Sequence, residues 1–245
     1  MIIVDLNQTM LANLHMQIGN HTNIDLDENM IRHMVLNAIR SYKQKFGNEY
    51  GNICIACDNT NIWRKKVFPY YKANRKKAIE KSELDWKQIF QIMGNIRQEL
   101  KDYFPYKVVD IESCEADDVI ATLCKNSDES KILILSGDKD FIQLHNERVK
   151  QYDPTRKKWI QHDNPYKYLM QHILKGDSGD GIPNVLSNDN CFVVGERQKP
   201  LREKKIEELI ELDISTKFDH SLFRNYRRNR QLIDLSQTPK DLQEA

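Results

Sequence analysis

The sequence has no strong excess of charge of either sign. Its 245 residues include 37 lysines and arginines against 36 aspartates and glutamates, which gives a formal net charge of +1. Net charge therefore neither favours nor excludes nucleic acid as a partner, and only segregation of charge within the chain could do so. The chain is 40% hydrophobic, which is enough for a core, and its length fits one large domain or one domain with an appendage.

Long apolar runs are also missing. No stretch approaches the roughly 20 apolar residues of a membrane span, so no membrane partner is expected. The N-terminal MIIVDLNQTM has no basic region before its apolar residues and no small-residue cleavage site, so it does not resemble a signal peptide. We expect a cytoplasmic protein that is a monomer.

Cysteines are few and odd in number. An odd count of five in a chain of this size favours a reduced protein over a disulfide framework. Cys54 and Cys57 form a CxxC, but they lie in the apolar run NICIAC, and no second Cys or His pair accompanies them. Buried structural cysteines are therefore favoured over zinc binding or redox chemistry.

Strand and helix patterns alternate along the chain. Short apolar runs predict buried strands at residues 2–4, 52–57 and 131–135. Apolar residues at helical spacing predict helices between them, at residues 28–47, 83–104 and 115–126, and Gly47 is expected to end the first helix. This alternation predicts an α/β fold with a mostly parallel central sheet flanked by helices. Residues 149–162 predict a short hairpin, and the polar remainder predicts a smaller helical C-terminal region.

Each predicted strand ends in an aspartate. Asp5 follows the first strand, Asp58 the second, and Asp138 and Asp140 the third. The functional crevice of an open parallel sheet lies at the carboxyl ends of its strands, so these side chains are expected to converge. Further acids follow in the first turn of a predicted helix and in the segment KGDSGDGIP: Glu115, Asp117, Asp118, Asp177 and Asp180.

Turns and helix caps explain each of these acids when it is taken alone. As a set they would repel one another, and a cluster of this kind needs a compensating cation. Oxygen ligands without a histidine or thiolate cluster suit Mg²⁺ or Mn²⁺. The number of acids favours two ions, an arrangement that serves phosphoryl chemistry.

A basic segment, residues 63–81, follows the second strand. It carries eight cations against the single acid Glu80, and its aromatic residues are interleaved as in surfaces that stack bases. A solvated helix face with ordinary core aromatics is the alternative, but a basic segment together with the acids favours nucleic acid. Its charge density and lack of a core pattern predict mobility. Residues 195–205 and 223–231 are weaker basic concentrations that fit solvated faces equally well.

Five motifs, taken in order, resemble the 5′-nuclease family, which includes flap endonucleases, the 5′-nuclease domain of bacterial DNA polymerase I and phage 5′–3′ exonucleases. The motifs are IVDLN, ACDN followed by WRKKVFPYYKANRKK, YKVVDIESCEADDVIATL, ILSGDKDFIQL and LKGDSGDGIPNV. Within the family, the closest likeness is to the ribonucleases H of T-even phages, and it covers nearly the whole chain. It implies a PIN-like fold, with a nuclease core at residues 1–160 that includes a basic arch at about 63–81, and a helix-turn-helix-like DNA-binding region at residues 161–245.

The resemblance also implies residue roles. Asp138 holds one metal ion and Asp140 the other: the first metal site matches Asp5, Asp58, Glu115, Asp117, Asp118 and Asp138, and the second matches Asp140, Asp177 and Asp180. Lys72, Arg75 and Asp138 are the expected catalytic residues, with Lys72 and Arg75 at the scissile phosphate. The expected DNA-binding residues are Arg64, Lys65, Lys66, Lys72, Arg75, Lys76, Lys77, Lys204 and Lys205.

The implied activity is metal-dependent hydrolysis near the 5′ end of a strand, on RNA primers paired with DNA and on 5′ flaps. Two Mg²⁺ ions are the expected cofactors, with Mn²⁺ as a substitute, and no covalent intermediate is expected. Many members follow GIP with a glycine-rich turn that often binds potassium. Here NVLSNDNC stands in its place, so a potassium site is not supported. A replication clamp or single-strand-binding protein is a further expected partner, although the T-even phage pattern continues past Ala245. A phage gene would place the protein in the host cytoplasm.

Three other functions remain as alternatives. A non-catalytic DNA-binding protein of the replication fork would gain nothing from carboxylates that repel phosphate. A PIN-type ribonuclease is related in fold but is usually shorter and lacks the basic segment. A phosphatase of small esters would need a DxD motif after the first strand, where this chain has Asp5, Leu6 and Asn7.

Overall fold

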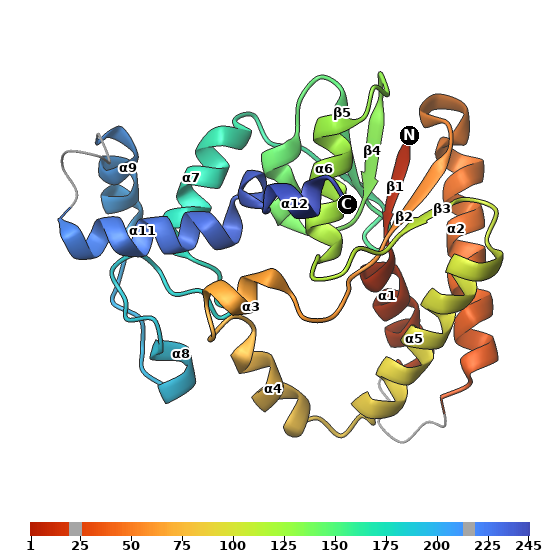
Figure 1. Ribbon diagram of the computed structural model, residues 1–245, viewed down its shortest axis with the longest axis horizontal. Coiled ribbons are helices and arrows are strands. Elements are labelled where there is room, and N and C mark those ends of the chain that lie inside the picture. The colour runs from red at the N-terminus through yellow and green to blue at the C-terminus, as the bar shows by residue number, and fades with distance from the viewer. Residues whose placement is uncertain (20–25, 213–218) are drawn as a thin grey trace. The chain divides into compact units, whose positions relative to one another are not determined.

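The computed structural model describes residues 1–19, 26–212 and 219–245. The chain forms two compact units, here called the sheet unit and the helical unit (Figure 1). The sheet unit comprises residues 1–61, 82–161 and 241–245, and the helical unit comprises residues 62–81 and 162–240. The basic segment therefore folds with the C-terminal part of the chain rather than with the sheet.

The sheet unit is built on one six-stranded sheet with the order β3-β2-β1-β4-β5-β6. Its strands are β1 (Ile2–Asp5), β2 (Ile53–Ala56), β3 (Lys107–Val109), β4 (Ile132–Leu135), β5 (Val149–Asp153) and β6 (Lys158–Ile160). All neighbours pair in parallel except β5 and β6, which form the predicted hairpin. The α/β fold and the three predicted strands are confirmed. The sequence pattern missed β3, because it has three residues and begins with an exposed lysine.

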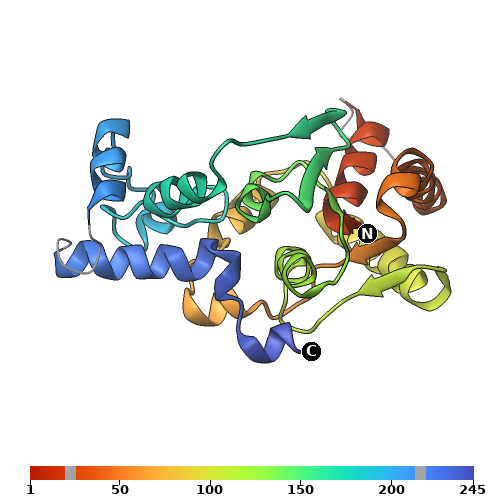
Figure 2. The ribbon, with the colours of Figure 1, turned by 90° about the horizontal axis from the view of Figure 1, so that it is seen from above.

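Helices cover both faces of this sheet. The sheet unit contains α1 (Leu6–Ile18), α2 (Glu28–Tyr50), α5 (Trp86–Tyr103), α6 (Ala116–Asn126) and the 3₁₀ helix η1 (Lys139–Leu144). Alternate strand residues such as Ile2, Val4 and Ile55 pack with α1, α2 and α5 in one core, while α6 contacts β1 and β2. Figures 1 and 2 show α2 and α6 on opposite sides of the sheet. The carboxyl edge of the sheet is thus set in a rigid, apolar frame.

The prediction that Gly47 ends its helix is wrong. Helix α2 continues to Tyr50, and it ends at Gly51, whose φ of 82° is readily available to glycine. Phe46 and Tyr50 are buried on the face of α2 that meets the core. Burial of these rings outweighs the weak helix propensity of a single glycine.

The helical unit has its own core. It contains α3 (Trp63–Val67), α4 (Ala73–Glu80), α7 (Pro165–Lys175), α8 (Cys191–Val194), α9 (Glu203–Glu211), α11 (His220–Ile233) and η2 (Leu235–Gln237), and α12 (Lys240–Gln243) follows. Phe68 and Tyr71 of the basic segment pack in this core with residues of α7, α9 and α11. Trp63 is also buried, so the base-stacking interpretation is wrong for these three rings, which are core residues. Within the described ranges, no helix is both long and apolar enough to cross a membrane.

Candidate active site

Two aspartates meet at the carboxyl edge of neighbouring strands β1 and β2. Asp5 is the last residue of β1 and caps α1 by accepting a hydrogen bond from the Gln8 N–H at 3.0 Å. Asp58 follows β2, and its Oδ1 accepts from the N–H of Ala116, at the start of α6, at 2.6 Å. The Asn7 side-chain amide donates to the other oxygen of Asp58. These contacts bring the ends of β1, β2 and α6 together, as the parallel-sheet rule predicts.

The first turn of α6 adds buried carboxylates. Glu115 is the N-cap, and Asp118 accepts from the Glu115 N–H at 2.9 Å in a capping box. Both side chains are almost fully buried, whereas Asp117 is partly exposed. Glu115 and Asp118 therefore do cap the helix, as the sequence alternative proposed. The cap holds them at the edge of the sheet where Asp58 accepts a hydrogen bond from the Ala116 N–H.

The turn after β4 carries Asp138 and Asp140. Asp138 caps η1 by accepting from the Asp140 N–H at 2.9 Å, and Ser136 Oγ donates to Asp5 at 3.0 Å. Gln151 of β5 is fully buried, and its Nε2 donates to the carbonyls of Ser136 at 2.8 Å and Asp138 at 2.6 Å. Sequence reasoning missed Ser136 and Gln151, and the only available signal was a glutamine inside a predicted strand.

The burial of Asp5 among like charges has an electrostatic cost. The pKa of Asp5 is raised from 3.8 to about 7, mainly by burial and then by the charges of Asp58 and Asp138, while hydrogen bonds from the Gln8 N–H and the Ser136 hydroxyl partly offset the shift. A bound cation would remove this cost. Among the described residues, the charged groups that shift the pKa of Asp5 are the carboxylates of Asp58 and Asp138, so the site fits a hard divalent cation.

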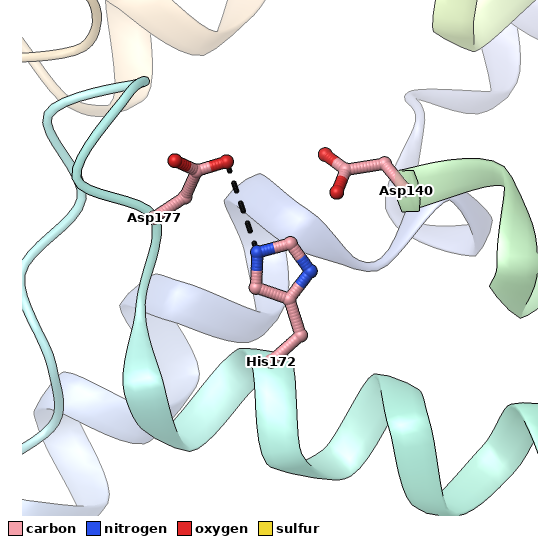
Figure 3. Close-up of side chains that lie close together, drawn as sticks. All are labelled: Asp140, His172 and Asp177. Carbon is pink, nitrogen blue, oxygen red and sulfur yellow. Dashed lines mark ion pairs between the residues drawn. The ribbon is translucent and has the colours of Figure 1, made fainter. Parts of the chain in front are cut away.

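Asp177 and Asp180 lie in the helical unit, in the loop after α7. Asp177 Oδ1 accepts from the N–H groups of Gly179 at 2.7 Å and Asp180 at 3.2 Å. Its Oδ2 lies 3.7 Å from His172 Nε2 of α7 (Figure 3, which also draws Asp140 of the sheet unit). Burial raises the pKa of Asp177, but the hydrogen bond and charge of His172 and the two N–H groups outweigh it, so the pKa lies below its usual value. Asp177 is thus held as a carboxylate.

Asp180 binds the two cations that were predicted to be catalytic. Its carboxylate lies 2.5 Å from the Arg75 guanidinium and 3.5 Å from Lys72 Nζ, and it accepts from the Tyr71 hydroxyl at 2.8 Å. The Lys72 N–H also donates to the Asp180 carbonyl at 2.7 Å. We call this arrangement of Asp180, Tyr71, Lys72 and Arg75 the Asp180 clasp. It fixes the start of α4 against the loop that carries Asp177.

The predicted DNA-binding cations differ in exposure. Arg64 has only 1% of its surface exposed, and its Nε donates to the Leu232 carbonyl at 2.9 Å. Its guanidinium lies over the Trp63 ring, 4.6 Å from the ring centroid, so its contacts are those of a core residue. In contrast, all the lysines of the predicted DNA-binding set are exposed or partly exposed: Lys65, Lys66, Lys72, Lys76, Lys77, Lys204 and Lys205.

Comparisons with known proteins show the family of this chain. The family described as 5′-3′ exonuclease, N-terminal resolvase-like domain, matches residues 1–171. Ribonuclease H of Enterobacteria phage T4 is 35% identical, over 98% of this chain and 82% of the phage protein. Flap endonuclease Xni of Shewanella sp. (strain MR-4) is 30% identical, over 55% of this chain and 52% of that protein.

Solved structures share the fold. The flap endonuclease of bacteriophage T5, in a complex with DNA and metal ions, superposes with a TM-score of 0.68 at 18% identity, over 99% of this chain and 94% of that chain. A crystal structure of the same phage protein with metal ions covers 99% of this chain and 95% of that chain, with a TM-score of 0.66 at 16% identity. Family match, phage relative and fold together show that this chain belongs to the 5′–3′ exonuclease family of nucleases.

Proposed function

We propose that the protein is a metal-dependent 5′–3′ exonuclease and flap endonuclease that hydrolyses phosphodiesters near 5′ ends. Its substrates would be RNA primers paired with DNA and 5′ flaps formed during replication, and it would act in the cytoplasm. The observation that carries this proposal is the convergence of Asp5, Asp58, Asp138 and the first-turn acids of α6 at one edge of the sheet. Membership of the family and the phage ribonuclease H relative support the substrate class.

The carboxylates of the sheet unit would hold the divalent cations, with Mg²⁺ as the natural ion. Such cations supply activation of the attacking water and compensation of phosphate charge. The protein's own part is to hold the carboxylates in position: the Gln8 N–H and Ser136 hydroxyl orient Asp5, and Gln151 holds the turn that bears Asp138. Two ions, with Asp138 on one and Asp140 on the other, remain part of the proposal.

The cations of the basic segment would bind the substrate. Lys72 and Arg75 are proposed to offset charge on the scissile phosphate, and the exposed Lys65, Lys66 and Lys76 would contact the strand on either side. Arg64 is left out of this set because it is buried and donates to the Leu232 carbonyl.

Cleavage of a 5′-labelled flap, with product sizing in Mg²⁺ and in chelator, tests the function. We expect wild-type protein to release 5′ products only with the metal. The double variant Asp138→Asn and Asp140→Asn should lose at least about a hundredfold in rate, because it removes two carboxylates that would bind metal. Equal rates for the variant and the wild type would show that the site is wrongly assigned.

The same samples separate an enzyme from a protein that only binds DNA. Binding of the flap is measured without divalent metal, where cleavage cannot interfere. A wild-type protein that binds the flap and leaves it intact in Mg²⁺ and in Mn²⁺ would contradict the proposed activity. A protein that cuts single-stranded RNA but not the flap would instead favour a PIN-type ribonuclease.

A further inference from the structure

A groove of about 1230 Å³ lies within the helical unit, and none of its described lining residues belongs to the Asp180 clasp. Its walls are residues of α7, the end of α9, α11 and η2, and Figure 1 shows α7, α9 and α11 as neighbours. Met170 and Tyr226 provide buried apolar lining, and the Tyr226 hydroxyl lies 3.8 Å from the Met170 sulfur. The groove belongs to no site described above.

The groove presents two aromatic rings to solvent. Tyr166, in the first turn of α7, has 70% of its surface exposed, and Phe223 of α11 has 37%. Most other aromatic rings of this unit that are described are buried or partly buried, so exposure of two rings at one groove is a distinctive feature. Large exposed aromatic rings in a groove are typical of surfaces that bind a partner.

The charge of the groove is entirely positive. Its described lining residues include His220 and the arginines of the segment 223–231, and none of them is acidic. Arg224 and Arg230 form ion pairs with Asp189 and Asp234, which lie outside the lining, yet each arginine keeps about half of its side chain exposed. A guanidinium has five N–H donors, so one ion pair leaves donors for a ligand.

Arg227 and Phe223 combine both features. The Arg227 guanidinium lies 6.0 Å from the centroid of the Phe223 ring, at the distance of a cation–π contact. They are four positions apart on α11, so they share one face of the helix with His220 and Arg230. Cations and an aromatic ring along one face of α11 match a ligand in which phosphate groups alternate with flat bases.

We propose that this groove binds single-stranded nucleic acid, with Arg224, Arg227 and Arg230 on phosphates and Tyr166 and Phe223 stacked on bases. An acidic peptide would satisfy the arginines, but nucleic acid uses both the charge and the two flat rings. This inference rests on the proposed function for the nature of the substrate, and it adds a second contact surface to the basic segment.

Binding of a fluorescein-labelled oligothymidylate, measured by anisotropy in chelator, tests the groove. Tyr166→Ala should weaken binding at least about fivefold, the lower limit for loss of one stacked base, and Arg227→Ala should weaken it more than about twofold by removing one phosphate contact. Arg227→Ala should also reduce the salt dependence by about one counterion. Tyr166→Phe, which keeps the ring, and Lys240→Ala, which removes an exposed cation outside the groove, should bind like the wild type.

Cross-linking gives a direct readout. An oligonucleotide with 5-iododeoxyuridine should cross-link to Tyr166 or Phe223, located by mass spectrometry of the digested protein. Binding within twofold for both alanine variants, or cross-links only to residues outside the groove, would overturn the proposal. So would variants that lose binding of polyglutamate but keep that of the oligonucleotide, since the groove would then be a protein-docking site. Flap cleavage is scored separately: an inactive wild type whose groove binds would refute only the proposed activity.

Discussion

At the residue scale, Asp5 lies where burial and like charges make its ionisation unfavourable, a cost that a bound cation would remove. The carboxylate is 7% exposed, and its neighbours Asp58 and Asp138 carry the same charge. A protein selected only for stability would place an uncharged residue there. Because the folded pKa is about 7 against an ordinary value of 3.8, the folded chain holds this proton more tightly than the unfolded chain does.

That difference predicts a pH-dependent stability in the absence of metal. Between about pH 4 and 7 the folded state binds more protons, so the free energy of unfolding falls as pH rises, by an amount on the order of a few kcal/mol. Asp5→Asn keeps an oxygen to accept from the Gln8 N–H and removes the charge. In chelator, this variant should therefore unfold at higher urea than the wild type at pH 8 and at similar urea near pH 4.5.

The exposed acid Asp102 offers a matched control, since Asp102→Asn should leave the pH profile unchanged. Adding Mg²⁺ at pH 8 should stabilise the wild type more than Asp5→Asn, because binding raises stability only where the folded state holds the ligand. Parallel pH profiles for the wild type and Asp5→Asn would contradict the assigned electrostatic cost.

At the scale of elements, the Asp180 clasp joins α4 to the loop after α7. Arg75 donates to the Asp180 carboxylate at 2.5 Å and also to the Gly179 carbonyl at 3.3 Å, while the Asn74 amide donates to the Ser178 carbonyl at 2.7 Å. Gly181, at a φ of 72°, lets the backbone approach, since a Cβ there would lie 3.0 Å from the Tyr70 carbonyl. The contacts of the clasp therefore fix the positions of Lys72 and Arg75 against the loop after α7.

A double-mutant cycle measures this contact. Asp180→Asn and Arg75→Gln should each destabilise the protein, and their coupling energy should be on the order of 1 kcal/mol, because the pair is charged and partly buried. Urea unfolding in chelator provides the measurement. Lys76 pairs with Glu80 rather than Asp180, so the cycle of Asp180→Asn with Lys76→Gln should show a coupling near zero. Equal couplings in the two cycles would exclude a specific clasp.

The elements also show which features a sequence can reveal. The buried strands and the acids at their tips were predictable, because strand burial and the parallel-sheet rule are local and general. Hydrogen bonds such as Gln151 to the Asp138 carbonyl were not, because they join residues that only the tertiary fold brings together. Phe68 and Tyr71 were misinterpreted for the same reason: their core partners come from α7, α9 and α11.

At the scale of the whole molecule, the near-zero net charge conceals two opposite charges. The sheet unit has 16 basic and 23 acidic residues, a net −7, and the helical unit has 21 basic and 13 acidic residues, a net +8. The acidic unit holds the carboxylate cluster, and the basic unit holds the basic segment and the groove. One unit is thus suited to cations and the other to phosphates.

This division predicts how nucleic-acid binding depends on salt. Removing the exposed pair Lys65 and Lys66 by alanine substitution should reduce the slope of log affinity against log salt by about one per lost phosphate contact. Lys157 and Lys158 are equally exposed but belong to the acidic sheet unit, so their double alanine variant, with the same change in net charge, should keep the wild-type slope. Flap binding in chelator across a range of salt concentrations provides the measurement. Equal slopes for the two variants would mean that total charge, rather than its segregation, governs binding.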